Sequence, residues 1–445
     1  MQNIDNIKVN GGTVLGKRQF LNIDIGVIAI MILIPMFMQI GKPALSLVFS
    51  VYTMYLQLQR KKGTSVLIYA MACCIPVLFS SKQEIIHNDF YWVYYSIRFP
   101  IILGFLLTYG RVRKLNFSFL IILGIVMIFL TGRYGSPDYN TWINNIIYLY
   151  FFFYICYYDK LDLRYLYLRF IPLIVIYVTY TYIQYLFGYN PYSNIMSFGQ
   201  MEQGTCGLSG HYIVQSVFLL TFIYLLLLRF RETGKLNFLI MGMIIVAGIM
   251  STSRTFILGF AIEIVIFLIL NRSRYKSKFI TKILIFAFLL IIGLLLFGTE
   301  ITDRLLDRFE WNIGHRESAF PTALAIFYAH PYGVGPNQLA DMMDIFARGD
   351  LIVGFGTFDN LFLTQFASYG VYCFIPLAFY SYYYIYSICK MRTYKNLFYM
   401  MSMFFLPWLA VGFSFDIESY GQILVVTGGM IGYIFMLYHK KLVKQ

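Results

Sequence analysis

Arginines in otherwise cation-poor segments are the first residues that point to chemistry. Arg254 follows the short polar run Ser251-Thr252-Ser253, and Arg316 lies in a long polar segment. Arg304 and Arg308 are spaced i and i+4, so a helix would place both on one face. A guanidinium binds phosphate through paired hydrogen bonds. All four arginines are therefore candidates for an anion site, and Arg304 and Arg308 have the alternative of pairing with the nearby Glu300, Asp303 and Asp307.

Asp359 and three histidines are the candidates for handling a proton. Asp359-Asn360 stands at the start of an apolar run, where a carboxylate can act as general base for a hydroxyl. Asp is also a preferred helix N-cap, and position alone does not separate the two roles. His211, His315 and His330 serve either as catalysts or as hydrogen-bonded scaffold. With no HExxH motif, no paired Cys and His spacing and no DxD motif in the outer loops, we expect no metal and no other cofactor.

Two ionisable residues fall inside apolar runs. Arg98 lies between Tyr95 and Pro100, and Glu263 lies nine residues after Arg254. A charge at membrane depth is costly, so such residues usually line a polar cavity or form an ion pair between helices. Both residues are therefore candidates for the site, with a structural ion pair as the alternative.

The elements that must position these residues are membrane spans. The 445 residues are 59% hydrophobic and 13% charged, against roughly 25% charged in soluble domains. Apolar runs of about 17 to 23 residues, long enough to cross a bilayer, recur along the whole sequence. We expect one all-α polytopic membrane domain over residues 1–445 with about fourteen spans, near residues 22–40, 44–59, 64–80, 90–109, 116–132, 143–158, 166–187, 211–228, 236–251, 254–271, 279–298, 360–389, 396–413 and 420–438.

The lysines and arginines give the orientation of these spans. Every second connection is basic, beginning with Lys8, Lys17 and Arg18 and ending with a cluster from Lys440 to Lys444. Basic connections stay in the cytoplasm, so both termini are predicted to be cytoplasmic. The net charge of +14 is then a topology signal, which argues against nucleic-acid binding.

One outward connection is much longer than the others. Residues 299–358 are too polar to span and offer room for an external subdomain. Helix-like apolar spacing covers 300–311 and 317–328, and the stretch 330–336 is typical of a turn. A helical hairpin on the membrane surface fits this pattern. A second outward loop, 188–210, is predicted to be irregular because it contains several glycines and a proline.

Four short motifs follow one another between residues 204 and 370. They are Gly204-Thr205-Cys206-Gly207 with His211 and Gln215; Ser251-Thr252-Ser253-Arg254; Arg316 followed by Pro331-Tyr332-Gly333-Val334-Gly335; and Asp359-Asn360 leading to Gly370. In this order, and with the long external loop, they make the segment resemble the region shared by bacterial O-antigen polymerases and O-antigen ligases, the Wzy-like family.

That resemblance implies a membrane glycosyltransferase of the GT-C type, whose donor is an oligosaccharide on undecaprenyl diphosphate. The acceptor hydroxyl would attack the anomeric carbon without a metal. The implied diphosphate-binding residues are Arg254 and Arg316, with Arg98, Arg304 and Arg308 as further candidates. The proton would pass to Asp359, to His315 or His330, or to no strong base, and the acceptor cleft would include His211, Asn360 and Glu263.

The resemblance also implies partners and a location. The partners are the lipid-linked oligosaccharide, the lipid bilayer and a protein that controls chain length, and the location is the bacterial inner membrane. Ligases of the family commonly carry a histidine beside an asparagine where this chain has Asp359-Asn360. This departure favours a polymerase of O-antigen or capsule repeat units over a ligase acting on a lipid A core.

Two alternatives come from other classes of protein. A flippase or transporter for lipid-linked oligosaccharides usually shows two related halves, and it has less use for a long external loop. A sensor would need a cytoplasmic signalling domain, and the cytoplasmic connections are too short for one.

Overall fold

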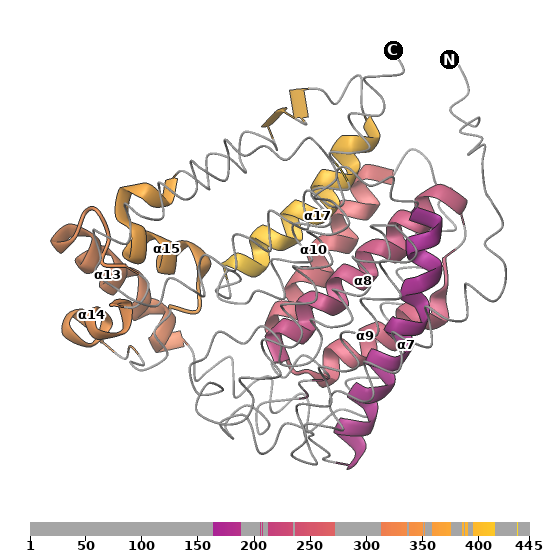
Figure 1. Ribbon diagram of the computed structural model, residues 1–445, viewed down its shortest axis with the longest axis horizontal. Coiled ribbons are helices and arrows are strands. Elements are labelled where there is room, and N and C mark those ends of the chain that lie inside the picture. Colours follow the sequence, from indigo (N-terminus) through magenta and orange to yellow (C-terminus); the bar gives the residue numbers. More distant parts are fainter. Residues whose placement is uncertain are drawn as a thin grey trace, which may run out of the picture.

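The described part of the chain is helical throughout. The computed structural model describes residues 163–187, 205, 207, 212–234, 236–271, 313–335, 338–349, 351, 358–374, 385–386, 388–389, 395–413 and 434. Its elements are α7 (Leu163–Phe187), α8 (Tyr212–Thr233), α9 (Phe238–Met250), α10 (Arg254–Asn271), α13 (Ile313–Ala329), α14 (Leu339–Phe346), α15 (Leu361–Tyr369), the 3-10 helix η5 (Gly370–Cys373) and α17 (Lys395–Gly412) (Figure 1). The predicted all-α class is confirmed for these residues.

Several helices match the predicted spans. Residues Tyr212–Arg231 of α8 and Arg254–Asn271 of α10 are long and apolar enough to cross a membrane. Shorter apolar stretches occur in α7, α9 and α17. These five helices coincide within a few residues with the spans predicted from 166 to 271 and from 396 to 413. The spans predicted before residue 160, at 279–298 and, apart from Ile434, at 420–438 lie outside the described residues, so the total of fourteen stays a prediction.

Helix α8 is the centre of the bundle. Its side chains are buried from Ile213 to Leu228, and it contacts α7, α9, α10 and α17. Helix α10 differs because Ile257, Leu258, Val265 and Ile269 are exposed along one side. An apolar face of this kind on a long apolar helix is suited to contact with lipid tails. The two candidate spans therefore differ in burial, since α8 is enclosed by other helices and α10 leaves one apolar side exposed.

Helices α8 and α10 run in the same direction. Gly259 of α10 lies against Leu220 of α8, and further along, the rings of Phe267 and Phe230 are 5.8 Å apart. The missing side chain of Gly259 leaves room for the Leu220 side chain to pack against α10, as small residues do in membrane bundles.

Helix α17 runs antiparallel to both. The guanidinium of Arg231, near the end of α8, lies 3.6 Å from the ring centre of Tyr399, near the start of α17. The Tyr224 hydroxyl donates a hydrogen bond to the carbonyl of Met400 (3.1 Å). Consequently the beginnings of α8 and α10 lie at the same end of the bundle as the end of α17. The charge pattern predicts that this end faces outward.

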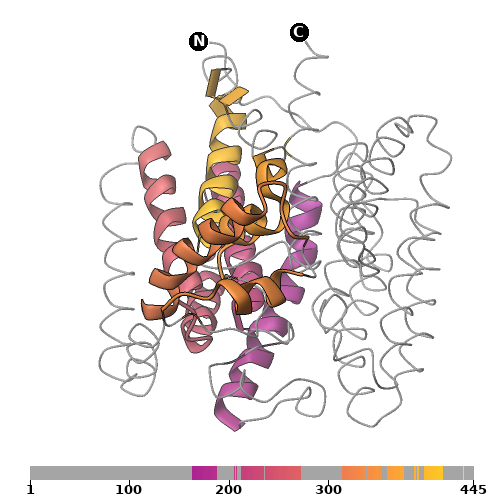
Figure 2. The ribbon, with the colours of Figure 1, turned by 90° about the vertical axis from the view of Figure 1, so that its left-hand side faces the viewer.

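Helices α13, α14 and α15 form a separate group near the end of α17 (Figures 1 and 2). Their shared core contains Ala319, Ala323, Ile326, Leu339 and Met343. Helix α13 confirms the helix predicted at 317–328, beginning four residues earlier, and the predicted turn follows it, with the Gly333 N–H bonded to the carbonyl of His330 (2.8 Å). The helix predicted at 300–311 lies outside the described residues.

The span predicted as continuous from 360 to 389 is wrong at its start. Helix α15 ends at Tyr369, and η5 follows as a separate 3-10 turn. Gly370 has φ 55° and ψ −133°, a conformation that no helix contains. The apolar composition of the stretch concealed this interruption.

Candidate active site

Arg254 is positioned by a tight turn between α9 and α10. Ser251, Thr252 and Ser253 are all buried, and the Thr252 N–H donates to the carbonyl of Ile249 (2.8 Å). The Ser253 carbonyl accepts the first bond of α10 from the N–H of Phe256 (3.1 Å). Thr252 has φ 49°, which is rare for a β-branched residue and costs energy. The turn therefore holds Arg254 at the start of α10, half exposed, in a fixed and strained geometry.

A layer of buried polar side chains supports this turn. The Ser251 hydroxyl donates to the carbonyl of Gly248 (2.5 Å) and lies 3.4 Å from the hydroxyl of Ser216 on α8. Gln215 directly precedes Ser216 on α8, and its Nε2 donates to the hydroxyl of Thr181 on α7 (3.0 Å), which in turn donates to the carbonyl of Tyr177. The layer thus joins α7, α8 and α9 beneath the turn.

The first of the four motifs docks onto the same layer. The Gly207 N–H donates to Gln184 Oε1 (2.7 Å), and Gly207 has φ +55°. A Cβ at this position would lie 3.1 Å from both the Gln215 side chain and the Thr181 hydroxyl. Sequence reasoning missed Thr181, Gln184 and Ser216. Their signal was present, because Thr181 and Gln184 are polar residues three apart in an apolar run.

Asp359 and Asn360 have separate roles at the start of α15. Asn360 is the N-cap, and its Oδ1 accepts hydrogen bonds from the N–H groups of Phe362 (3.0 Å) and Leu363 (3.1 Å). Its Nδ2 donates to the carbonyl of Phe413, the residue after α17 (3.0 Å). Asp359 precedes the cap with φ 50°. The alternative reading of Asp359 as an N-cap is therefore wrong, because Asn360 fills that role.

The third motif interlocks with α15 through main-chain hydrogen bonds. The N–H of Gly335 donates to the carbonyl of Ser368 (2.8 Å), and the N–H of Val371 donates to the carbonyl of Pro331 (3.0 Å). A Cβ on Gly370 would collide with the Pro331 carbonyl, and one on Gly333 with the Ser368 carbonyl. The glycines of this motif are needed for close approach of two backbones, so its first role is to hold α13 against α15.

Arg316 and His330 lie at opposite ends of α13. Arg316 is exposed in the first turn of the helix, and His330 directly follows its last residue. The His330 ring is half-buried and meets the ring of Phe346 edge-on, with the centroids 6.2 Å apart. His315 belongs to α13, but its side chain is outside the described part. Arg98, His211, Arg304 and Arg308 also lie outside it.

The start of α10 and the end of α17 place Arg254 and Asn360 at a similar height along the helix bundle. Gly259 packs on Leu220, so Arg254 is level with about residue 215 of α8. Val217 and Val411 line one cavity, so Phe413 is level with about the same residue. Because Asn360 is bonded to Phe413, the turn before Arg254 and the start of α15 occupy the same end of the molecule.

The end of the bundle where α10 begins also carries two residues other than glycine with a strained backbone, that is, with positive φ. Thr252 and Asp359 are the two such residues with positive φ in the described ranges. One lies two residues before Arg254, and the other is the candidate base. Backbone strain of this kind is concentrated at functional sites, where contacts with the surrounding structure hold the unfavourable backbone angles in place. Arg254, Asp359 and Asn360 therefore lie at the same end of the described bundle, and Arg316 and His330 belong to α13, which packs on α15.

Glu263 lies away from this group. It is nine residues, about 14 Å, further along α10 than Arg254, in a cavity between α8, α10 and α17. Its carboxyl has neither a hydrogen bond nor an ion pair within the ranges the structure describes. The structural ion pair considered from sequence therefore has no cation among those residues. In the same ranges, no three His, Cys, Asp or Glu side chains gather as metal ligands.

Residues 236–378 match the sequence model of the Wzy_C family, which is described as O-antigen ligase. The matched stretch begins just before α9 and ends after η5, so it contains Arg254, Arg316, His330 and Asp359. Comparisons with curated proteins and with solved structures found no match. The resemblance seen in the sequence motifs is confirmed for this stretch, which matches the Wzy_C family. The family consists of polytopic membrane enzymes of lipid-linked polysaccharide assembly.

Proposed function

We propose that this chain, with its Wzy_C domain at residues 236–378, is a polysaccharide polymerase of the cell membrane. It would join oligosaccharide repeat units carried on undecaprenyl diphosphate, at the outer face of the membrane. The observation that carries the proposal is that two strained turns, one before Arg254 and one at Asp359, occupy the same end of the bundle. One turn offers a cation that can bind the diphosphate, and the other offers a carboxylate that can accept the proton of the attacking hydroxyl.

In the proposed reaction, the hydroxyl oxygen of one repeat unit attacks the anomeric carbon of the donor glycan. The bond from that carbon to the diphosphate oxygen breaks, and undecaprenyl diphosphate leaves with the bonding electrons. Arg254 would bind the diphosphate as negative charge grows on it, and Arg316 would approach it from α13. The acceptor proton passes to the Asp359 carboxylate.

Asp359 is favoured over His330 as the base because of its setting. Its neighbour Asn360 already caps α15, so the carboxyl is not needed there, yet the chain keeps a strained aspartate at that position. His330 packs against Phe346 instead. His315 remains a proposal from sequence, as do Arg98, Arg304, Arg308 and His211.

The proposal is tested by reconstitution with lipid-linked repeat units and detection of the products as a ladder. Arg254→Ala and Arg316→Ala should each lower the rate by about 10²-fold or more, with Arg254→Lys in between, since one charge without the paired geometry remains. Arg348→Ala is the matched control, because Arg348 is an exposed arginine that lies just after α14, in the group of α13, α14 and α15. Equal losses in all the alanine variants would contradict a specific diphosphate role.

The base is tested in the same assay. Asp359→Asn should lower the rate by about 10²-fold or more while the protein still folds, because the amide cannot take the proton. His330→Gln should retain most of the activity. The reverse order would assign the proton to His330.

An O-antigen ligase is the second candidate, and the description of the matching family favours it. It would transfer a finished glycan once, to a lipid A core. In the assay, a ladder without added core supports the polymerase, and a single transfer that requires core supports the ligase. Movement of labelled lipid between leaflets with neither product would contradict both and support a flippase.

A further inference from the structure

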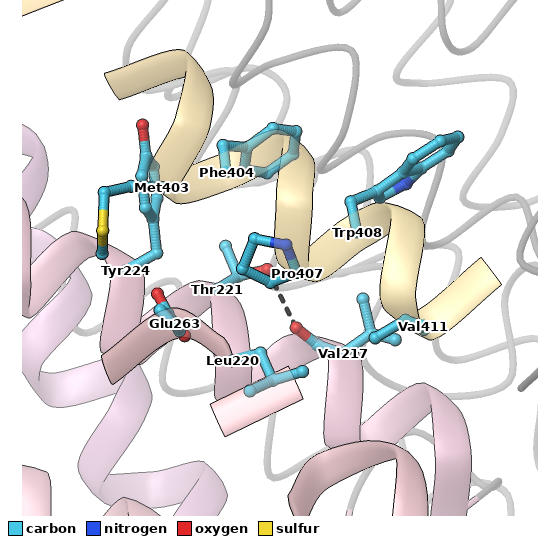
Figure 3. A pocket seen from close by; sticks show the side chains of 10 residues that line it. All are labelled: Val217, Leu220, Thr221, Tyr224, Glu263, Met403, Phe404, Pro407, Trp408 and Val411. Atoms are coloured by element: carbon cyan, nitrogen blue, oxygen red, sulfur yellow. Dashed lines mark hydrogen bonds between the residues drawn. The ribbon is translucent and has the colours of Figure 1, made fainter. Parts of the chain in front are cut away.

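Glu263 and helix α17 form a second polar site, deep in the bundle. Glu263 is 1% exposed, and both of its carboxyl oxygens lack hydrogen-bond partners in the described part of the chain. It borders a cavity of about 40 Å³ between α8, α10 and α17 (Figure 3). A buried carboxyl without a partner costs free energy, so it calls for an occupant of this cavity.

The opposite wall of the cavity contains a helix-interior proline. Pro407 lies within α17 and borders the cavity together with Met403. Proline has no N–H, so it cannot donate the bond that the carbonyl of Met403, four residues earlier, would accept in a regular helix. The nearby Thr221 hydroxyl already donates to the Val217 carbonyl (2.9 Å). Glu263 therefore needs a hydrogen bond here, and the Met403 carbonyl lacks the helical N–H partner that residue 407 would otherwise supply.

Size and lining decide what fills the cavity. A water molecule needs about 10–15 Å³ on this measure, so a volume of about 40 Å³ holds two or three waters and no sugar ring. A hard cation takes about six oxygen ligands. This wall offers one carboxyl among side chains such as Leu220, Phe404 and Trp408, which is too few oxygens for a cation.

We propose that Glu263, as the uncharged acid, binds a small cluster of internal waters that connects it to the main chain of α17 at Pro407. The acid O–H donates to a water, and the waters donate in turn to the Met403 carbonyl. The cluster joins α10 to α17 midway along both helices. Because α17 continues from Pro407 to Gly412, directly before Phe413, whose carbonyl accepts the Asn360 bond, the cluster also sets where the start of α15 lies. Glu263 is therefore a positioning residue.

The test is a mutant cycle on thermal stability of the purified full-length protein in detergent. Glu263→Gln should leave the Tm within about 1 °C, because the amide also donates and accepts hydrogen bonds. Glu263→Leu should lower the Tm by about 3 °C or more, because the waters lose their donor. In a Pro407→Ala background the Leu substitution should cost less than half as much, because residue 407 then supplies the missing N–H.

Several outcomes would overturn the proposal. A Tm raised by Glu263→Leu would mean that the site is better dry and apolar, and a Glu263→Gln loss as large as that of Leu would mean that the charged form is required. A rise in Tm with Na⁺ or K⁺ over choline, removed in Glu263→Gln, would assign the cavity to a cation. If the Leu variant does not accumulate, normal accumulation of Glu263→Gln supports the proposal and its failure contradicts it. None of these readouts depends on the glycan substrate.

Discussion

The helix bundle and the group of α13, α14 and α15 are built in different ways. Helices α8, α10 and α17 meet through side chains, with rings such as Tyr224 and Phe404 5.5 Å apart and Gly259 facing the flexible end of Leu220. The group of α13, α14 and α15 is fastened by main-chain hydrogen bonds between residues 331–335 and residues 367–371. Side-chain contacts can adjust by changing rotamers, whereas two backbones in contact cannot. The difference suggests that the position of α13 relative to Asp359 is fixed more tightly than the positions of the spans.

Among substitutions that test this difference between the two regions, Gly370→Ala should cause the largest loss of stability and activity. Gly370→Ala places a methyl group against the Pro331 carbonyl in a backbone conformation that alanine avoids, so the interlock should open. We expect a loss of about 3 kcal/mol of stability and loss of polymer synthesis, measured by thermal unfolding and by the ladder assay. Gly234→Ala is the matched control. Gly234 also has positive φ, at +68°, but nothing lies within 4 Å of its added Cβ, so we expect a cost of about 1 kcal/mol. Equal effects would mean that strain, and not the interlock, decides the outcome.

Asn360 should show an intermediate effect because it belongs to both regions. Asn360→Ala removes the cap of α15 and the bond to Phe413, with an expected loss of about 1–2 kcal/mol. Asn360→Asp keeps the capping oxygen but loses the donor to Phe413. If the link between the two regions matters for catalysis, Asn360→Asp should retain most of the stability but lose activity. Full activity in Asn360→Asp would show that the cap alone is needed.

Gly259 should show the smallest effect, although its added methyl group also overlaps a neighbour. The Cβ of Gly259→Ala would meet Leu220 Cδ1, which is the end of a flexible side chain. Leu220 can rotate away, so we expect a loss of about 1 kcal/mol by thermal unfolding. Gly259→Ala combined with Leu220→Ala should cost less than the sum of the two single variants. A loss as large as that of Gly370→Ala would remove the distinction between the two regions.

The sequence was informative where side-chain composition decides the structure. The apolar runs predicted α7 to α10 and α17, and the spacing at 317–328 predicted α13, because burial of apolar faces is a local pattern. The turn after His330 was predicted for a similar reason, since Pro331 and Gly333 restrict or permit local backbone angles.

The sequence was less informative where remote backbone contacts decide the structure. The end of α15 at Gly370 depends on the Pro331 carbonyl, about forty residues earlier, and no local pattern encodes that contact. The choice between Asp359 and Asn360 as the N-cap depended on Phe413, which binds the Asn360 amide. Helix α14 was not predicted, because only Leu339 and Met343 of its eight residues are buried and the apolar signal is short.

The late position of α17 in the sequence has a consequence for how the protein is synthesised. Helix α17 covers the cavity side of α8 and α10, but it begins about 120 residues after α10 ends. While a membrane protein is synthesised from its N-terminus, α10 is complete long before α17 exists. We therefore expect Glu263 to spend that interval facing lipid or another part of the nascent chain. Chains that stop before residue 395 would leave this carboxyl uncovered, which gives quality-control proteases of the membrane a feature to recognise.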